Sequence, residues 1–167
     1  MENEFLKIKK AENVDGRDYF YAERKGKDSI AFILWNKDKE KQQVGLIKEF
    51  KPPVGKFLKT AFGGSLDQPN STPIDMCIRE VEEEAGFKVD RSKVIYVGSY
   101  FVSTQMNQFC HLYLVNVKEK DFVGRKPQDK SEEAAEVVWM NPNEVFLTQD
   151  WKSVTIVSVA SMKNLIK

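Results

Sequence analysis

Hydrophobic residues occur along the chain in short runs. Some of these runs are unbroken, and in others apolar and polar residues alternate. The unbroken apolar run at 29–35 (SIAFILW) predicts a strand buried on both faces. A charged turn at 36–43 and a second apolar stretch at 44–50 (VGLIKEF) follow, which predicts a hairpin. Two prolines and a glycine within 51–57 predict a break in the sheet. Further strands are predicted at 5–12, 19–25, 92–103, 108–118 and 135–140, with a turn at 105–107 and a surface loop at 119–133.

A central helix is predicted by signals at both of its ends. Thr72 can cap the helix, Pro73 suits its first position, and Asp75 favours the positive end of the helix dipole. Gly86 stands where a left-handed residue commonly closes a helix. The stripe expected to face the sheet consists of Ile74, Ile78, Val81 and Ala85.

Helices are also predicted near the end of the chain. Asn141 and Pro142 have the residue types of an N-cap and a first helical position. The stretch from Trp151 to Leu165 is ambiguous, because its β-branched residues favour a strand while its length and spacing favour a helix; we predict a helix. This order of elements predicts one domain over residues 1–167, an α/β or α+β sandwich around a mixed sheet.

Composition is that of an ordinary globular protein, with 41% apolar and 31% charged residues. The net charge of +1 argues against a basic nucleic-acid-binding surface, so a nucleic-acid partner is not expected. The sequence has no apolar run of about 18 residues and no secretory pattern at its start, so we expect no membrane association. Cys77 and Cys110 lie in apolar surroundings, which predicts buried thiols and a cytoplasmic protein.

The central helix concentrates acidic residues on one face. Glu80, Glu83 and Glu84 stand at i, i+3 and i+4, where like charges repel by about 0.2–0.5 kcal/mol per pair. Charge runs of this kind are usually solvated helix surfaces, but these glutamates lie toward the C-terminal end, where the helix dipole disfavours them. A divalent cation would convert the repulsion into coordination, and Gly63 and Gly64 would let backbone groups approach a ligand closely. The pattern therefore favours a metal site.

Residues 79–87 (REVEEEAGF) resemble the second half of the Nudix box, whose consensus is G-x5-E-x7-R-E-U-x-E-E-x-G-U, with U a bulky apolar residue. Every specified position of that half carries the expected residue type. The first half departs, because the sixth residue after Gly64 is Asn70 instead of glutamate, and eight residues rather than seven separate Asn70 from Arg79. Phe62 stands where a proline often precedes the glycines. We therefore expect this loop to differ from its relatives.

The resemblance extends beyond the box. Residues 44–57 resemble the segment before the box in Nudix ADP-sugar hydrolases, where glutamine and arginine are usual in place of Glu49 and Lys51. Residues 135–145 are similar to the segment that follows the box. Over about residues 28–148 the chain is identified as a member of the Nudix family, which implies a mixed β-sheet sandwiched between α-helices.

The resemblance also implies roles for individual residues. Glu80, Glu83 and Glu84 would hold Mg²⁺ or Mn²⁺, with the carbonyl of Gly63 as a further ligand. Arg79 would pair with Glu83 and orient Glu80, and a metal-activated water would attack a phosphoanhydride. The residue that accepts the proton stays open between a box glutamate and three glutamates of the loop at 128–136, namely Glu132, Glu133 and Glu136.

A nucleoside diphosphate linked to a second group is the implied substrate, and residues 44–57 favour ADP-ribose or another ADP-sugar. Expected substrate contacts are Lys48, Lys51, Gly64 and Phe101. ADP-sugar hydrolases of this family often dimerise through their N-terminal strands, which implies a homodimer interface at residues 1–24.

Two alternatives stay open at this stage. The chain could hydrolyse other nucleotides, such as modified nucleoside triphosphates, dinucleoside polyphosphates or capped RNA. It could also be a Nudix-fold module that binds a nucleotide without cleaving it, although such modules typically lose the box glutamates that this chain retains.

Overall fold

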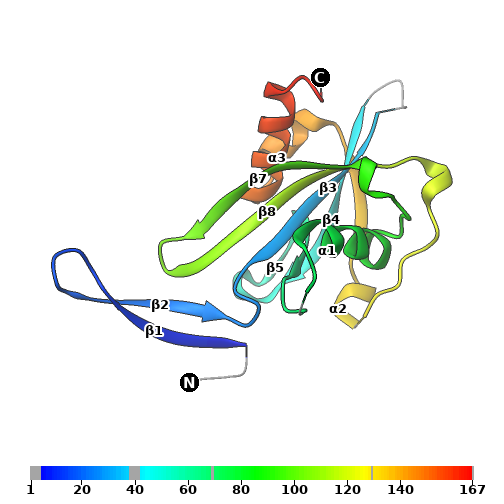
Figure 1. The fold of residues 1–167 in the computed structure, drawn as a ribbon. Helices are drawn as coiled ribbons and strands as arrows, with labels where there is room; N and C mark the ends of the chain where they lie inside the picture. The colour runs from blue at the N-terminus through cyan, green and yellow to red at the C-terminus, as the bar shows by residue number, and fades with distance from the viewer. Residues whose placement is uncertain (1–4, 38–41, 69, 129, 167) are drawn as a thin grey trace.

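A computed structural model describes residues 5–37, 42–68, 70–128 and 130–166 (Figure 1). The described residues form a nine-stranded mixed sheet with helices on both faces, as predicted. The main path through the sheet runs β1-β2-β8-β3-β4-β5, while β6 pairs with β3, β7 with β8 and β9 with β4. The strands are β1 (Leu6–Glu12), β2 (Asp18–Arg24), β3 (Ser29–Asn36), β4 (Gln43–Lys51), β5 (Lys56–Thr60), β6 (Phe62–Ser65), β7 (Val94–Ser103), β8 (Met106–Asn116) and β9 (Glu136–Met140).

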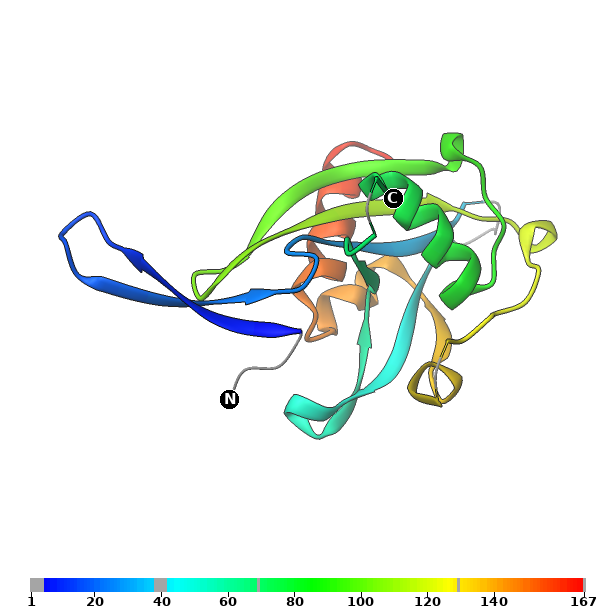
Figure 2. The same cartoon turned by 60° about the horizontal axis from the view of Figure 1, so that its bottom comes forward.

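Strand β3 is the centre of the core. Its apolar side chains alternate between two hydrophobic clusters, so both of its faces are buried, as the unbroken run predicted. Ile30, Phe32 and Leu34 pack under helix α1 (Pro73–Glu80). Ala31, Ile33 and Trp35 pack under helix α3 (Trp151–Met162), on the opposite face (Figure 2).

Two details of the predicted strands were wrong. Residues 51–57 do not break the sheet, because Pro52–Val54 form a 3-10 turn and β5 returns antiparallel to β4. Gly55 closes that turn with a φ of 64°, a conformation that favours glycine. Met106 and Asn107 lie within β8 rather than in a turn. The predicted turn at 36–43 includes residues 38–41, which lie outside the described residues.

Helix α1 begins as predicted, with the Thr72 side chain accepting a hydrogen bond from the Asp75 backbone N–H. It does not continue as an α-helix, because Val81–Ala85 form a π-helical turn that Gly86 closes at a φ of 80°. We call residues 73–85 the acidic helix. Its buried side is broader than the predicted stripe, because Met76 and Cys77 are buried with Val81 and Ala85, whereas Ile74 and Ile78 are only partly buried.

The helices after Asn141 and from Trp151 follow the prediction, whereas α2 (Lys130–Glu133) was not predicted. A 3-10 helix (Pro142–Leu147) has Asn141 as its N-cap, and the short helix α2 lies in the predicted loop. Helix α3 begins after Asp150, whose buried carboxylate Oδ2 accepts hydrogen bonds from Ser153 N at 3.1 Å and Ser153 Oγ at 2.6 Å. The same oxygen accepts from the Ala61 backbone N–H at 2.8 Å. Asp150 thus ties the start of α3 to the entry of β6.

Strands β1 and β2 form a two-stranded arm that reaches away from the body of the protein (Figures 1 and 2). The arm joins the body through a bridge between Ala22 and Met106, and the Tyr19 hydroxyl donates to the Thr104 carbonyl at 2.6 Å.

Cys77 and Cys110 are free and buried, as predicted. No helix in the described ranges is long and apolar enough to cross a membrane.

Candidate active site

A cleft of about 480 Å³ opens between the acidic helix and strand β6, and α2 borders it on a third side. The acidic helix supplies carboxylates, and β6 supplies a glycine backbone that pairs with β3. The cleft therefore places acidic side chains from the predicted box beside the two glycines that precede it. Its lining residues are Gly63, Gly64, Ser65, Asp67, Gln68, Arg79, Glu80, Glu83, Glu84, Gln128 and Glu132.

Burial raises the pKa of two carboxyl groups in this cleft, Glu80 and Glu84. Desolvation, followed by the negative charges of Glu80 and Glu132, raises the pKa of Glu84 to about 8, although a backbone hydrogen bond from Gly63 opposes the rise. Desolvation also raises the pKa of Glu80, and the neighbouring charge of Glu83 adds to the effect. A cation held between these groups would remove the repulsion among them.

Arg79 supplies positive charge at the edge of this cluster. Its Nη2 atom lies 3.4 Å from Oε1 of Glu80, and its Nε atom lies 3.8 Å from Oε2 of Glu83. The contacts agree with those that the resemblance implied, and Arg79 lowers the pKa of Glu80 against the larger effect of burial. The Nε atom is buried without a hydrogen-bond acceptor, so the Arg79 side chain is only partly satisfied.

Glycine at position 64 leaves room for the Glu80 carboxylate opposite it, which a larger residue would force to move. A Cβ atom there would lie 2.7 Å from Oε1 of Glu80 and 2.9 Å from its Cδ, closer than such atoms approach. The absence of a side chain therefore lets Glu80 rest against the β6 backbone. Asn70, which stands where the Nudix consensus has glutamate, adopts a φ of 67° in the left-handed region. The irregular loop thus turns at the residue that departs from the consensus.

Of the three loop glutamates, the structure brings only Glu132 to the cleft. Glu133 is exposed and outside the lining. Glu136 lies in β9, where its Oε1 accepts from Lys48 Nζ at 2.6 Å, and that bond lowers its pKa. The structure therefore brings Glu132 to the acidic helix and leaves Glu133 and Glu136 outside the cleft lining, and the identity of the glutamate that accepts the proton stays a prediction.

The structure likewise brings only some of the expected substrate-binding residues to the cleft or to the cavity beside it. Gly64 lines the cleft and Lys51 lines an adjoining cavity. Lys48 instead pairs with Glu136, because residues three apart in a strand face opposite sides of the sheet. Phe101 lies in β7 with its ring 5.7 Å from that of Phe109, and it lines neither cavity. Lys48 and Phe101 are therefore not brought to the cleft.

The donor set fits a hard divalent cation, since it offers several carboxylate oxygens in one half-buried cleft. In the part of the chain that the structure describes, no group of three or more His, Cys, Asp or Glu side chains is already close enough to hold an ion. Arg79 contacts two of the carboxylates instead. Ion binding therefore requires the glutamate side chains to move toward one another.

Comparison with known families decides the assignment. The family model of the NUDIX domain matches residues 26–157, which is most of the chain. The chain belongs to the Nudix family. Nudix domains hydrolyse derivatives of nucleoside diphosphates and generally use a divalent metal such as Mg²⁺, so this protein is a Nudix pyrophosphohydrolase in general terms. A search of curated proteins finds no match.

The raised pKa of Glu84 predicts a pH-dependent stability of the metal-free Nudix domain. The folded-state pKa of about 8 exceeds the ordinary glutamate value of 4.5, so ionisation opposes folding and the free energy of unfolding falls as pH rises between these two values. At pH 8 in chelator, we expect Glu84→Gln to raise the melting temperature by at least about 2 °C. Thermal denaturation with and without chelator measures this.

Glu82→Gln is the matched control, because Glu82 lies on the same helix turn but is exposed and paired with Lys126 at 2.6 Å. Its replacement should not raise the melting temperature. Added Mg²⁺ should stabilise the wild-type protein and the control, but not Glu84→Gln. An unchanged melting temperature of Glu84→Gln across pH 5–8 relative to wild type would show that Glu84 is not strained in the metal-free state.

Proposed function

We propose that this Nudix protein hydrolyses the phosphoanhydride of a nucleoside diphosphate linked to a second group, with ADP-ribose or an ADP-sugar as its substrate. The observation that carries this proposal is that Glu80, Glu83 and Glu84 line one cleft together with Gly63 and Gly64. These carboxylates would hold Mg²⁺ or Mn²⁺, and the Gly63 carbonyl stays a predicted further ligand.

When bound, a divalent ion would neutralise the diphosphate and lower the pKa of a water molecule in the cleft. The protein's own groups have separate tasks. Arg79 holds Glu80 and Glu83 through its two contacts and so keeps their carboxylates directed into the cleft. Gly64 leaves the space beside the β6 backbone that the Glu80 carboxylate fills.

Glu132 is the proton acceptor that we propose. It faces the acidic helix across the cleft, and its charge raises the pKa of both Glu80 and Glu84. Its carboxylate also accepts from the Gln128 backbone N–H at 2.5 Å, which fixes its direction. Glu132 lies on a different element from the carboxylates that would hold the metal. It can therefore accept a proton from water while those carboxylates stay coordinated to the ion.

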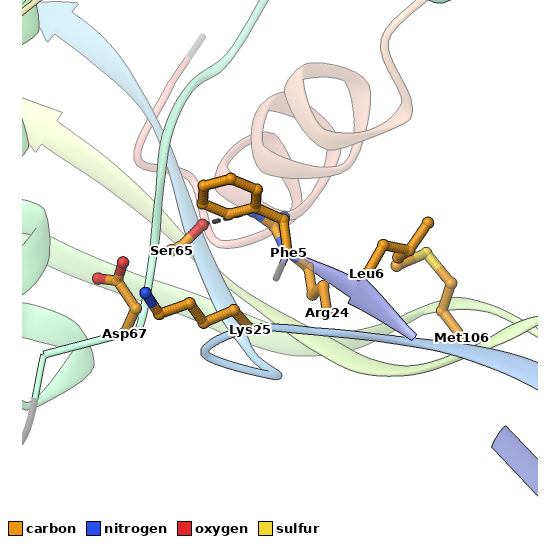
Figure 3. Close-up of a pocket in the computed structure, with 7 residues that line it drawn as sticks. All are labelled: Phe5, Leu6, Arg24, Lys25, Ser65, Asp67 and Met106. Atoms are coloured by element: carbon orange, nitrogen blue, oxygen red, sulfur yellow. Dashed lines mark hydrogen bonds between the residues drawn. The ribbon is translucent and has the colours of Figure 1, made fainter. Parts of the chain in front are cut away.

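The nucleoside end of the substrate has a cavity of its own. A cavity of about 530 Å³ lies between the arm and the residues after β6, within the usual range of about 300–1,000 Å³ for ligand pockets. Figure 3 shows the Phe5 ring, Leu6 and Met106 around it, with Arg24 bonded to Ser65. The apolar groups suit the faces of a base. The cavity shares Ser65 and Asp67 with the carboxylate cleft, so one substrate can reach both.

Activity measurements test the proposed function. We expect Mg²⁺-dependent hydrolysis of ADP-ribose or an ADP-sugar at higher kcat/KM than dinucleoside polyphosphates, modified nucleoside triphosphates and capped RNA. Glu83→Gln should lower kcat by at least about 100-fold while the protein stays folded, because a charged metal ligand is lost. Glu82→Gln, one residue away and outside the cleft, should retain activity.

Each other result has a definite meaning. Preference for a triphosphate, a dinucleotide or capped RNA would replace the substrate and keep the reaction class. Nucleotide binding without cleavage of any of these compounds would instead favour a binding module. Full activity of Glu83→Gln would remove Glu83 from the metal site.

The assignment of the base gives a separate prediction. Glu132→Gln should lower kcat by about 10²-fold or more with little change in KM, since the amide cannot accept the proton. Glu133→Gln and Glu136→Gln are the controls, because both side chains lie outside the cleft lining. A kcat loss in Glu133→Gln or Glu136→Gln equal to that in Glu132→Gln would contradict the assignment.

A homodimer through residues 1–24 stays a prediction that the shape of the arm supports. Leu6, Ile8 and Phe20 are exposed, and their register places them on one face of the arm. A two-stranded hairpin is marginally stable alone, so a second copy covering this face would stabilise it.

Sedimentation velocity tests the dimer. We expect twice the 19.3 kDa mass of the chain for wild type, and the monomer mass for the double variant Ile8→Glu, Phe20→Glu. Lys9→Glu, on the other face of the arm, is the control and should leave the mass unchanged. A monomeric wild-type protein at micromolar concentration would contradict the predicted interface.

A further inference from the structure

A second polar cavity, of about 230 Å³, adjoins the carboxylate cleft and shares Gly63, Gly64, Ser65 and Glu84 with it. Three cationic side chains line it, from segments far apart in the sequence. They are Arg24 at the end of β2, Lys51 at the end of β4 and Lys152 in the first turn of α3.

Two of these cationic side chains form a hydrogen bond, and the third is placed by the helix that carries it. The Arg24 guanidinium donates to Ser65 Oγ on β6, which also carries Gly63 and Gly64 and is called the glycine strand. Lys51 donates to Glu49 Oε1 at 2.5 Å. Lys152 has no such bond, and its position follows from the α3 N-terminus, which the buried Asp150 carboxylate attaches to the Ala61 backbone.

The charges around this cavity are not balanced by the protein. Glu49 neutralises Lys51, and Glu84 belongs to the proposed metal site. Within the described ranges, neither Arg24 nor Lys152 forms an ion pair with a carboxylate, and both side chains are half-buried. Like charges gathered around one cavity repel one another, and an anion placed among them would remove that repulsion.

We infer that Arg24, Lys51 and Lys152 form a phosphate subsite that binds the phosphoryl group next to the one attacked at the metal, an inference that rests on the proposed function. The two glycines carry no side chain between the cleft and this cavity, so a diphosphate can extend from one to the other along β6. Arg24 can engage phosphate oxygens with a planar fork, whereas the two lysines act as point charges.

The subsite also explains why the start of α3 is fixed so firmly. A buried carboxylate that accepts from Ala61 N, Ser153 N and Ser153 Oγ leaves little freedom for the first helical turn. Lys152 lies within that turn, so its backbone is fixed beside the cavity that its side chain lines without an ion pair. In this arrangement Lys152 is a binding residue for substrate, not a participant in proton transfer.

Calorimetric titration with ADP and AMP tests the subsite without requiring turnover. We expect Lys152→Gln to raise the Kd of ADP about 10-fold, the loss of one charge-assisted contact, and to change the Kd of AMP by less than about threefold. Lys163→Gln, an exposed position beyond the last turn of the same helix, is the control for loss of charge and should bind ADP as wild type does. Lys152→Arg should restore most of the affinity, which separates lost charge from misfolding.

The outcomes distinguish this inference from the proposed function. Wild-type affinity for ADP in Lys152→Gln, or equal losses for ADP and AMP, would overturn the subsite even if the enzyme hydrolyses ADP-ribose. An equal loss in Lys163→Gln would overturn it too, as would the absence of ADP binding by wild type. Conversely, a selective loss of ADP binding in Lys152→Gln supports the subsite even if no compound of the substrate panel is hydrolysed. In an active enzyme, the same variant should raise KM about 10-fold with kcat changed less than about twofold.

Discussion

The burial of negative charge beside a bare backbone is the constraint on which the rest of the structure depends. Glu80 and Glu84 are held in the cleft because the opposite side of their helix packs on β3 through residues such as Val81 and Ala85. A freely solvated helix could turn these carboxylates toward water, but a packed one cannot. The cost of that confinement appears as the raised pKa values, and a cation in the cleft would offset it.

The fold surrounds this cluster with groups from distant parts of the chain. β3 is packed on both faces, so the acidic helix and α3 lie on opposite sides of one strand, and β6 pairs with that strand between them. The Asp150 carboxylate then fixes the start of α3 to the backbone just before β6. As a result, β6 borders both the carboxylate cleft and the cavity that Arg24, Lys51 and Lys152 line. A diphosphate placed along it would meet both the metal and the lysines.

The two ends of the acidic helix show what local sequence patterns can predict. Thr72, Pro73 and Gly86 act where their residue types predicted, because capping depends on backbone groups within a few residues. The π-helical turn at Val81–Ala85 was not predicted, since a hydrophobic stripe at helical spacing does not separate an α-turn from a π-turn. That turn carries two of the three box glutamates, so the directions of Glu83 and Glu84 differ from those of a regular helix.

By contrast, local sequence patterns do not predict where the loop glutamates and the basic residues lie. Glu132, Glu133 and Glu136 have the same chemistry, and only the path of α2 and β9 selects Glu132 for the cleft. Lys152 carried no local signal at all, because it meets Lys51 only through the packing of α3.

By itself, then, the sequence determined the family, the mixed sheet with its buried central strand, and the placing of the three box glutamates on one helix, because each of these is encoded in short patterns. Only the tertiary structure decided which glutamate faces the helix and which cations meet at the glycine strand. Those choices depend on contacts between residues far apart in the sequence, such as Asp150 with Ala61, and no local pattern records them.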